Sequence, residues 1–240
     1  MTSTSSGGAG TGPARIVVYG DFNCPYSYLA SQRLDEILER SLADVEWRAV
    51  EHDRSISLTG EPTGPTRDEW QRELDEVAGL AIHGEDVATA PPAMLSNTRA
   101  ATSAFAEAMT DGLEHEMRRA LFEAVWVRQQ NISTAGEVRQ VVTRLMWPPV
   151  PLQVFRATDL PMPSSQTEPA RVARVLGGTV APDGGPLSTP AYRRIQRWRQ
   201  EWLSLPQQVV PTVVDEGELH QGVDGLKRLA EICAVQPGRR

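Results

Sequence analysis

The sequence has only two cysteines, Cys24 and Cys233, among 240 residues. Two are too few for the disulfide framework of a small secreted protein, and a chain of this length buries a sufficient core without one. It also lacks any run of about 20 apolar residues of the kind that spans a bilayer. We therefore expect neither a disulfide scaffold nor a membrane partner.

Basic residues are also fewer than acidic ones. The chain has 24 Lys and Arg against 31 Asp and Glu, which gives a net charge of −7. Such a chain repels a nucleic-acid backbone on average, so we expect no nucleic-acid partner. Residues 1–13 are rich in Ser, Thr, Gly and Ala and lack the basic start and apolar run of a secretory signal. The sequence predicts disordered tails at 1–13 and 237–240 and a cytoplasmic location.

Residues 14–50 have the pattern of a strand, a helix and a second strand. Residues 14–20 form a β-branched run that ends in glycine, as expected of a buried strand. Apolar residues at near-helical spacing predict a helix over 27–40, immediately after Cys24 and Pro25. Residues 45–50 alternate apolar and polar and predict a second strand, parallel to the first.

Strand patterns return only near the end of the chain. Residues 208–214 predict a strand that contains one proline, 218–220 a second hairpin arm, and 223–234 a final helix. The section between the two ends has helical periodicity, with Thr66 and Glu69 as a possible capping box and Asn97 as a further cap. The helices expected in this section cover 66–82, 97–112, 113–130, 134–146 and 189–203, with prolines 148, 149 and 151 ending the fourth and a short helical piece at 171–176.

The order of these elements predicts an α/β protein with an inserted all-helical domain. The terminal pieces, 14–58 and 206–236, are expected to share one sheet in a discontinuous domain, and 59–205 form the insertion. The functional site is expected where the two modules meet.

Cys24 lies between the first strand and the first helix, so it occupies a helix N-terminus. Free N–H groups and the helix dipole favour an anion there, and cysteines in such settings titrate at roughly 3.5–7.5 instead of about 8.5. Pro25 fits the first helical position, where its missing N–H is not needed. This placement predicts a reactive thiolate, against the alternative of a buried structural thiol.

The segment from Asp21 to Leu29, which reads DFNCPYSYL, resembles the active-site segment of DsbA-like oxidoreductases of the thioredoxin fold, especially their cytoplasmic FrnE-type branch. This branch is related to 2-hydroxychromene-2-carboxylate isomerases and kappa-class glutathione transferases. Val210, Pro211 and Thr212 resemble the family loop that carries a cis-proline beside the active cysteine. The resemblance implies a thioredoxin-like domain with the helical insertion, and a substrate site that includes Pro25, Tyr26, Val210 and Pro211.

The sequence departs from the family at Ser27, where the family has a second cysteine. A serine cannot form the internal disulfide, so the resemblance implies single-cysteine exchange in which Cys24 forms a mixed disulfide with a small thiol or a protein disulfide. A glutathione-like thiol would then release the intermediate, with no tightly bound cofactor. Ser27 is a second catalytic candidate because its hydroxyl can donate to the Cys24 thiolate. Two alternatives stay open: a thiol-dependent isomerase or transferase, and a peptide-binding protein that has lost turnover.

Other candidates have weaker patterns. His52 follows the second strand, so it is expected at the same sheet edge as Cys24, where it could bind substrate; a solvated loop histidine is the alternative. Cys233 lies in the last helix among apolar residues, which favours core packing. The four arginines at 193, 194, 197 and 199 predict a solvated helix face, although one could attract an anionic thiol. No metal site is expected, because the histidines lack partner spacing.

Overall fold

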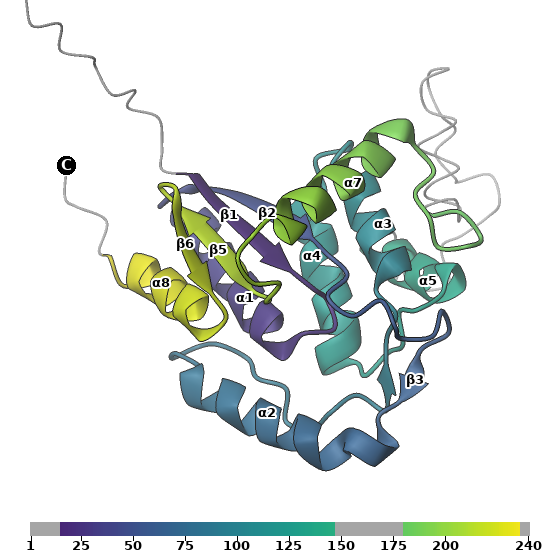
Figure 1. The fold of residues 1–240 in the computed structure, drawn as a ribbon, viewed down its shortest axis with the longest axis horizontal. Coiled ribbons are helices and arrows are strands. Elements are labelled where there is room, and N and C mark those ends of the chain that lie inside the picture. Colours follow the sequence, from purple (N-terminus) through teal and green to yellow (C-terminus); the bar gives the residue numbers. More distant parts are fainter. Residues whose placement is uncertain (1–14, 147–179, 236–240) are drawn as a thin grey trace, which may run out of the picture.

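A computed structural model of the chain describes residues 15–146 and 180–235. Its core is a four-stranded sheet in the order β2-β1-β5-β6, formed by β1 (Arg15–Gly20), β2 (Asp44–Ala49), β5 (Thr212–Asp215) and β6 (Glu218–Gln221) (Figure 1). β1 pairs with β2 in parallel and with β5 antiparallel, so Val17 lies between Glu46 and Val214. The expected sheet shared by both ends of the chain is confirmed.

Two helices cover one face of the sheet. α1 (Pro25–Glu39) and α8 (Val223–Ala234) pack side by side, and Leu29, Leu34 and Leu229 are fully buried between them and the strands. α8 begins and ends where its apolar spacing predicted. α1 begins at Pro25, two residues before the expected start.

The section between the two ends of the sheet is mainly helical, but it is not all-helical as expected. β3 (Glu61–Pro62) and β4 (Met94–Leu95) form a short antiparallel pair within it. Thr63 holds these segments together, because its N–H donates to the carbonyl of Ala93 at 3.2 Å. The helical elements are η1 (Gly64–Thr66), α2 (Arg67–Leu80), α3 (Arg99–Ala108), α4 (Glu114–Phe122), η2 (Glu123–Val127), α5 (Ala135–Met146) and α7 (Thr189–Leu203).

Three local expectations are corrected by the structure. Thr66 caps no helix through its side chain, because Gly64–Thr66 forms a 3₁₀ turn that runs directly into α2. The helix expected over 113–130 is α4 followed by the π-helical η2, and it ends before Gln129, whose φ is 55°. The late strand begins at Thr212 and not at 208, because its ladder with β1 starts at the pair Tyr19 and Thr212.

Another expected feature is shifted along the chain, and the rest lie outside the described residues. The predicted cap Asn97 lies one residue before the N-cap of α3, which is Thr98, although its Oδ1 accepts the N–H of Arg99, the first residue of α3, at 3.1 Å. The predicted tails at 1–13 and 237–240, the prolines after α5 and the short helical piece at 171–176 fall outside the described residues.

The last residue of β1 is Gly20, and no larger residue fits at this position. A Cβ at this position would lie 2.2 Å from the Trp47 ring and 3.2 Å from Ser27 Oγ. Trp47 is buried, and its ring meets Phe122 of α4 edge-on at 5.5 Å. Close packing of the tryptophan against β1 therefore fixes the backbone just before the turn that carries Cys24.

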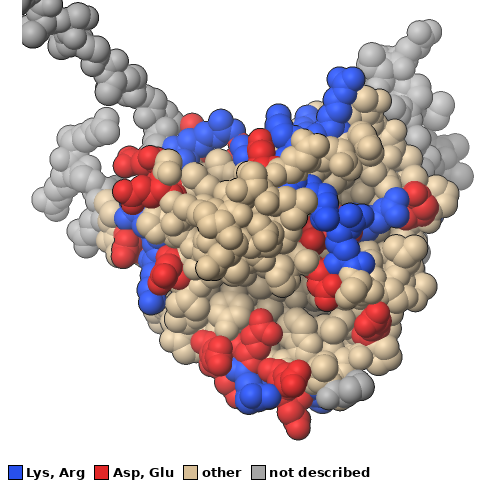
Figure 2. Space-filling view, in the orientation of Figure 1, with Lys and Arg blue, Asp and Glu red and all other residues tan. Residues whose placement is uncertain are grey.

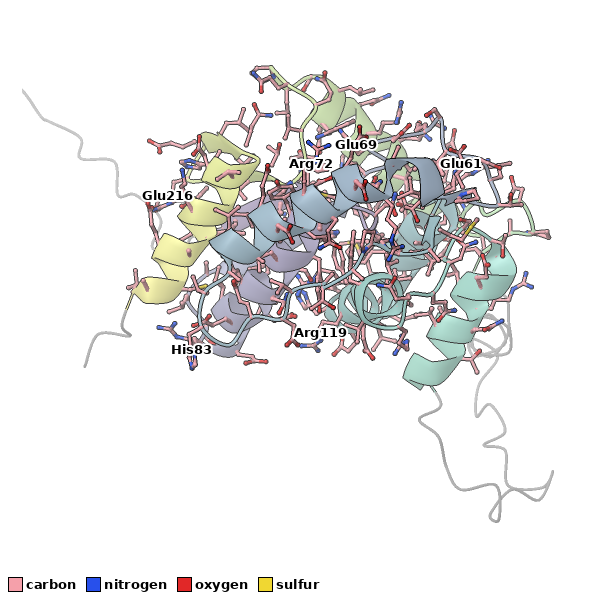
Figure 3. All side chains as sticks on the ribbon, turned by 90° about the horizontal axis from the view of Figure 1, so that it is seen from below. Glu61, Glu69, Arg72, His83, Arg119 and Glu216 are labelled. Carbon is pink, nitrogen blue, oxygen red and sulfur yellow. The ribbon has the colours of Figure 1, made fainter. Side chains whose placement is uncertain are left out.

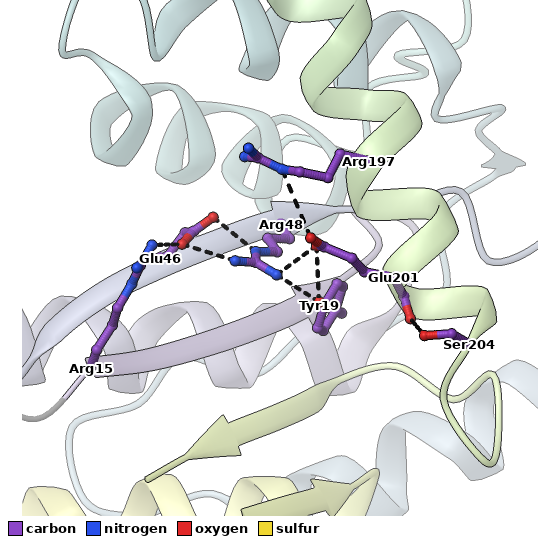
Figure 4. A network of polar contacts seen from close by, with 7 residues as sticks. All are labelled: Arg15, Tyr19, Glu46, Arg48, Arg197, Glu201 and Ser204. Carbon is purple, nitrogen blue, oxygen red and sulfur yellow. Dashed lines mark hydrogen bonds and ion pairs between the residues drawn. The ribbon is translucent and has the colours of Figure 1, made fainter. Parts of the chain in front are cut away.

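A network of charged side chains joins α7 to the edge of the sheet (Figure 4). The Arg48 guanidinium on β2 donates to the Tyr19 hydroxyl at 2.7 Å and to Glu201 of α7 at 2.6 Å. Its Nε also donates to Glu46 at 2.8 Å, and Arg15 pairs with the same carboxylate. Burial opposes ionisation of Glu46, but hydrogen bonds and charges from the two arginines lower its pKa overall.

A buried ion pair connects three elements of the fold. Arg33 of α1 is 1% exposed, and its Nε lies 2.7 Å from a Glu85 carboxylate oxygen in the segment after α2. Its two Nη atoms donate to the carbonyls of Leu226 at 2.6 Å and Leu80 at 2.7 Å. One guanidinium therefore fixes α1, α8 and the end of α2 relative to each other.

We predict that Arg33→Ala lowers the free energy of unfolding by about 3–5 kcal/mol, because it leaves the Glu85 carboxylate buried without its cation. Lys227→Ala, which removes the exposed partner of Asp224, is the control and is expected to change it by less than about 1 kcal/mol. Urea unfolding followed by circular dichroism measures both. Equal effects of the two substitutions would contradict the prediction.

Candidate active site

A pocket of about 400 Å³ opens at the end of β1, between the sheet and the helical section. Both modules contribute to its walls, as the sequence predicted. It is lined by Asp21, Asn23, Cys24, Tyr26, His52, Asp53, Ile56, Trp70, Glu73, Leu95, Val209 and Val210.

Cys24 is the N-cap of α1, directly before its first residue, Pro25. Its backbone is extended, with φ −106° and ψ 122°, and its N–H donates to the carbonyl of Asp21 at 3.1 Å. Its Sγ accepts the N–H of Ser27 at 3.4 Å, so the sulfur itself caps the helix. The predicted position at a strand-to-helix turn, with Pro25 as the first helical residue, is confirmed.

A second segment approaches the sulfur from the far end of the chain. The Val210–Pro211 peptide bond is cis, as the resemblance implied. The Cys24 Sγ lies 3.6 Å from the carbonyl oxygen of Val210, to which the thiol donates. Val210 lines the pocket, whereas Pro211 lies behind it and accepts the N–H of Gly222 through its carbonyl at 2.8 Å.

Ser27 lies one helical turn after Cys24 and is fully buried. Its Oγ accepts the N–H of Asp21 at 3.3 Å, which leaves the hydroxyl hydrogen free to point at the sulfur. Ser27 therefore contacts Cys24 through both its hydroxyl and its backbone N–H. It supports the site from behind and is not part of the pocket wall.

The expected low pKa of Cys24 is wrong. Burial raises the pKa of the thiol to about 12, and the hydrogen bonds from the Ser27 hydroxyl and N–H only partly oppose this. The carboxylates of Glu73 and Asp21 raise it further through their negative charge. The helix terminus favours an anion, but the surrounding pocket disfavours it more strongly, so the resting group is a thiol.

Asp21 organises the loops around the sulfur. Its buried carboxylate accepts the N–H of Asn23 at 3.1 Å and the N–H of His52 at 2.7 Å, and it also hydrogen bonds to the Thr98 side chain. These partners come from the cysteine turn, the end of β2 and the start of α3. Burial raises the pKa of this carboxyl group even though each of these bonds lowers it.

The cysteine turn is also fixed to the helical section. Phe22 is fully buried, and its ring lies 5.0 Å from that of Phe122. The indole N–H of Trp126 donates to the carbonyl of Phe22 at 3.0 Å. Asn23 accepts the N–H of Ser96 at 3.3 Å. The two modules therefore meet directly at the turn that carries the thiol.

Helix α2 forms the wall opposite the cysteine turn. Trp70 and Glu73 are one turn apart on it and line the pocket. Tyr26 reaches the same helix, because its hydroxyl donates to Glu76 at 3.0 Å. Burial and the neighbouring carboxylates raise the pKa of Tyr26.

His52 lies at the rim of the pocket, as expected from its place after β2. Its backbone N–H is held by Asp21, and its exposed ring meets Trp202 of α7 edge-on at 6.2 Å. The expected position at the same sheet edge as Cys24 is confirmed, because His52 lines the pocket, and a role in substrate binding stays a prediction.

The other candidates lie away from the pocket. Cys233 is buried in α8, where its thiol donates to the carbonyl of Arg33 at 3.6 Å and burial raises its pKa to about 12. Arg194 of α7 donates to the carbonyl of Ala106 and to Thr110. None of the α7 arginines lines the pocket.

Several lining residues were not predicted as site residues. Asp21 and Asn23 belong to the recognised motif, and a carboxylate three residues before a helix-capping cysteine was a usable signal. Trp70 and Glu73 follow a helical pattern with no chemical signal, and only the packing of α2 against α1 brings them to the pocket that Cys24 lines.

Over residues 15–146 and 180–235, no group of three or more His, Cys, Asp and Glu side chains is arranged to hold a metal ion. Within the same ranges, no helix has the length and apolar character needed to cross a bilayer.

A family model described as the DSBA-like thioredoxin domain matches residues 15–153. Among solved structures, the chain is similar to a 2-hydroxychromene-2-carboxylate isomerase, with 19% identity, a TM-score of 0.59 and coverage of 90% of this chain and 93% of the other. It is also similar to the cytosolic disulfide reductase DsbM from Pseudomonas aeruginosa with GSH, with 16% identity, a TM-score of 0.56 and coverage of 92% and 96%. The search of curated proteins found no match.

We predict that alkylation of Cys24 by iodoacetamide rises with pH toward a midpoint near pH 12. At pH 8 we expect a rate roughly 40–100-fold below that of free cysteine, since the loss of thiolate is partly offset by the greater nucleophilicity of a high-pKa thiol. Peptide mass spectrometry measures the rate and separates Cys24 from Cys233.

Ser27→Ala is expected to slow the reaction further, because the thiolate loses a hydrogen-bond donor. A midpoint at or below pH 8.5, or faster alkylation of the Ser27→Ala variant, would contradict this description of the site.

Proposed function

Because the chain belongs to the DSBA-like thioredoxin domain family, a family of thiol-disulfide oxidoreductases and isomerases, we propose that it exchanges thiols and disulfides through Cys24 alone. The observation that carries this proposal is the placement of the Cys24 sulfur. It lies between the N–H of Ser27 and the carbonyl of Val210, at the wall of a pocket of about 400 Å³. The residue keeps intermediate exposure, so a disulfide in the pocket can reach the sulfur.

The proposed first step is a displacement at sulfur. The Cys24 thiol loses its proton to solvent, and the thiolate attacks one sulfur of a disulfide RSSR. A bond forms between Sγ and the RS group, the original S–S bond breaks, and the leaving thiolate takes a proton to become RSH. The N–H of Ser27, which already donates to the sulfur, stabilises the negative charge before attack.

The second step requires a thiol from outside the protein. Ser27 occupies the position from which a second cysteine would attack the mixed disulfide, and its hydroxyl cannot do so. A second small thiol R′SH attacks the mixed disulfide instead and releases RSSR′ and the Cys24 thiol. The protein undergoes no net oxidation, and no tightly bound cofactor is needed. Such a reaction suits a reducing compartment such as the cytoplasm, where free thiols are abundant.

The protonated state of Cys24 favours a second candidate. A thiol that donates to Val210 and whose pKa is raised to about 12 is a weak nucleophile at neutral pH. It can instead hold a bound small thiol whose own sulfur reacts with an electrophile, as in a thiol-dependent isomerase or transferase. The isomerase structure that shares this fold is compatible with such a use of the pocket.

We predict that native protein forms a mixed disulfide at Cys24 that persists until an external thiol is added. Ser27→Cys is expected to remove this requirement, because a thiol at position 27 lies beside the Cys24 sulfur and displaces the adduct within the protein. Intact-mass spectrometry after a pulse of bis(2-hydroxyethyl) disulfide, with peptide mapping, follows both proteins. Cys24→Ser is the matched control and is expected to form no adduct there.

Each alternative gives a distinct result. Turnover of an electrophile with added thiol, without any adduct at Cys24, would contradict the exchange reaction and support the isomerase or transferase reaction. Binding of extended peptides that survives Cys24→Ser, with no reaction of either kind, would indicate a binding protein.

A further inference from the structure

The pocket beside Cys24 is acidic. Of its twelve lining residues, Asp21, Asp53 and Glu73 are carboxylates, His52 is the one titratable base, and none is a lysine or arginine. In the space-filling view, acidic side chains gather at the lower edge of the molecule, over α2, with basic side chains among them, beneath a hollow of uncharged residues (Figure 2). A negatively charged ligand therefore meets no counterion in the pocket wall.

The three carboxylates differ in how they are used. Asp21 holds backbone N–H groups, and Asp53 accepts the N–H of Ser55 at 2.8 Å and its hydroxyl at 2.6 Å. Glu73 has no hydrogen bond and no ion pair with any residue of the described ranges. It is half-buried, faces the pocket from α2, and acts on the thiol of Cys24 only through its charge.

The free carboxylate of Glu73 is thus a group of fixed charge without a partner, placed across the pocket from the nucleophile. Burial and the neighbouring Glu76 raise the pKa of Glu73, and the charge of His52, which lines the same pocket, opposes this only in part. A positive group bound beside it would relieve this repulsion and would also stabilise the Cys24 thiolate.

We propose that Glu73 determines the charge of the exchange partner, and that the pocket selects disulfides and thiols that carry positive charge next to their sulfur. This inference rests on the proposed exchange at Cys24 and specifies its substrate class. Glu73 acts here as a specificity-determining residue. It attracts a cation to the pocket and repels carboxylates, so a dianionic disulfide reacts slowly.

The test compares three symmetric disulfides of similar size: cystamine, which is cationic; bis(2-hydroxyethyl) disulfide, which is neutral; and 3,3′-dithiodipropionate, which is anionic. Rates of adduct formation at Cys24 are measured at pH 8 and low ionic strength and divided by the rates with free cysteine. We expect the ratio of the cystamine rate to the dithiodipropionate rate to be at least about tenfold, and to fall as salt is added.

Glu73→Gln is expected to reduce this ratio several-fold. Glu69→Gln is the matched control: it removes the same charge one turn earlier in α2, from an exposed residue outside the pocket, and should leave the ratio within about twofold. Figure 3 shows Glu69 and Arg72 on α2, viewed from below. Because removing Glu73 also changes the pKa of Cys24 for every probe, only the ratio reports on selection.

The outcomes separate this proposal from the proposed function. Equal corrected rates for the three probes, or a ratio that Glu73→Gln leaves unchanged, would overturn the charge selection and leave the exchange intact. No adduct with any probe would overturn the exchange itself.

The positively charged partner in the exchange could be a small molecule or a basic protein segment. Two peptide mixed disulfides, with lysines or glutamates flanking the cysteine, distinguish these sources. Selection among the small disulfides alone supports a small-molecule partner, and selection among the peptides as well supports a basic segment. Absence of selection in both series overturns the proposal.

Discussion

The arrangement of the site depends on one buried carboxylate. Asp21 lies at the carboxyl end of β1, and its two oxygens accept the backbone N–H groups of Asn23 and His52 while Thr98 adds a third hydrogen bond. These bonds join the cysteine turn, the end of β2 and the start of α3. Without them, buried N–H groups would lose their partners, and the thiol would lose its position between the two modules.

The same burial that fixes the thiol also keeps it protonated. The Cys24 sulfur caps α1, which stabilises a thiolate, but the pocket removes water from it and faces it with the carboxylates of Asp21 and Glu73. The second effect is larger, so the free protein holds a thiol that donates to Val210. Reactivity therefore depends on what enters the pocket. A ligand that brings positive charge changes the balance in favour of the thiolate.

Much of the fold was predictable, because it follows from local patterns. The bounds of α7 and α8, the parallel pairing of β1 with β2 and the cysteine at the start of α1 follow from apolar spacing and from residues adjacent in sequence. β3 and β4 are two residues each and carry no periodic signal. The pKa of Cys24 was predicted in the wrong direction because its burial and the charge of Glu73 from α2 arise only from tertiary packing.

The central claim is that Cys24 carries the exchange inside the pocket between the two modules. A crystal structure of the native protein after reaction with cystamine tests it most directly. We predict electron density for one cysteamine group bonded to the Cys24 sulfur, extending between Trp70 and Val210 with its ammonium group beside Glu73. An adduct that points away from the pocket, or one on Cys233 with Cys24 unmodified, would contradict the account.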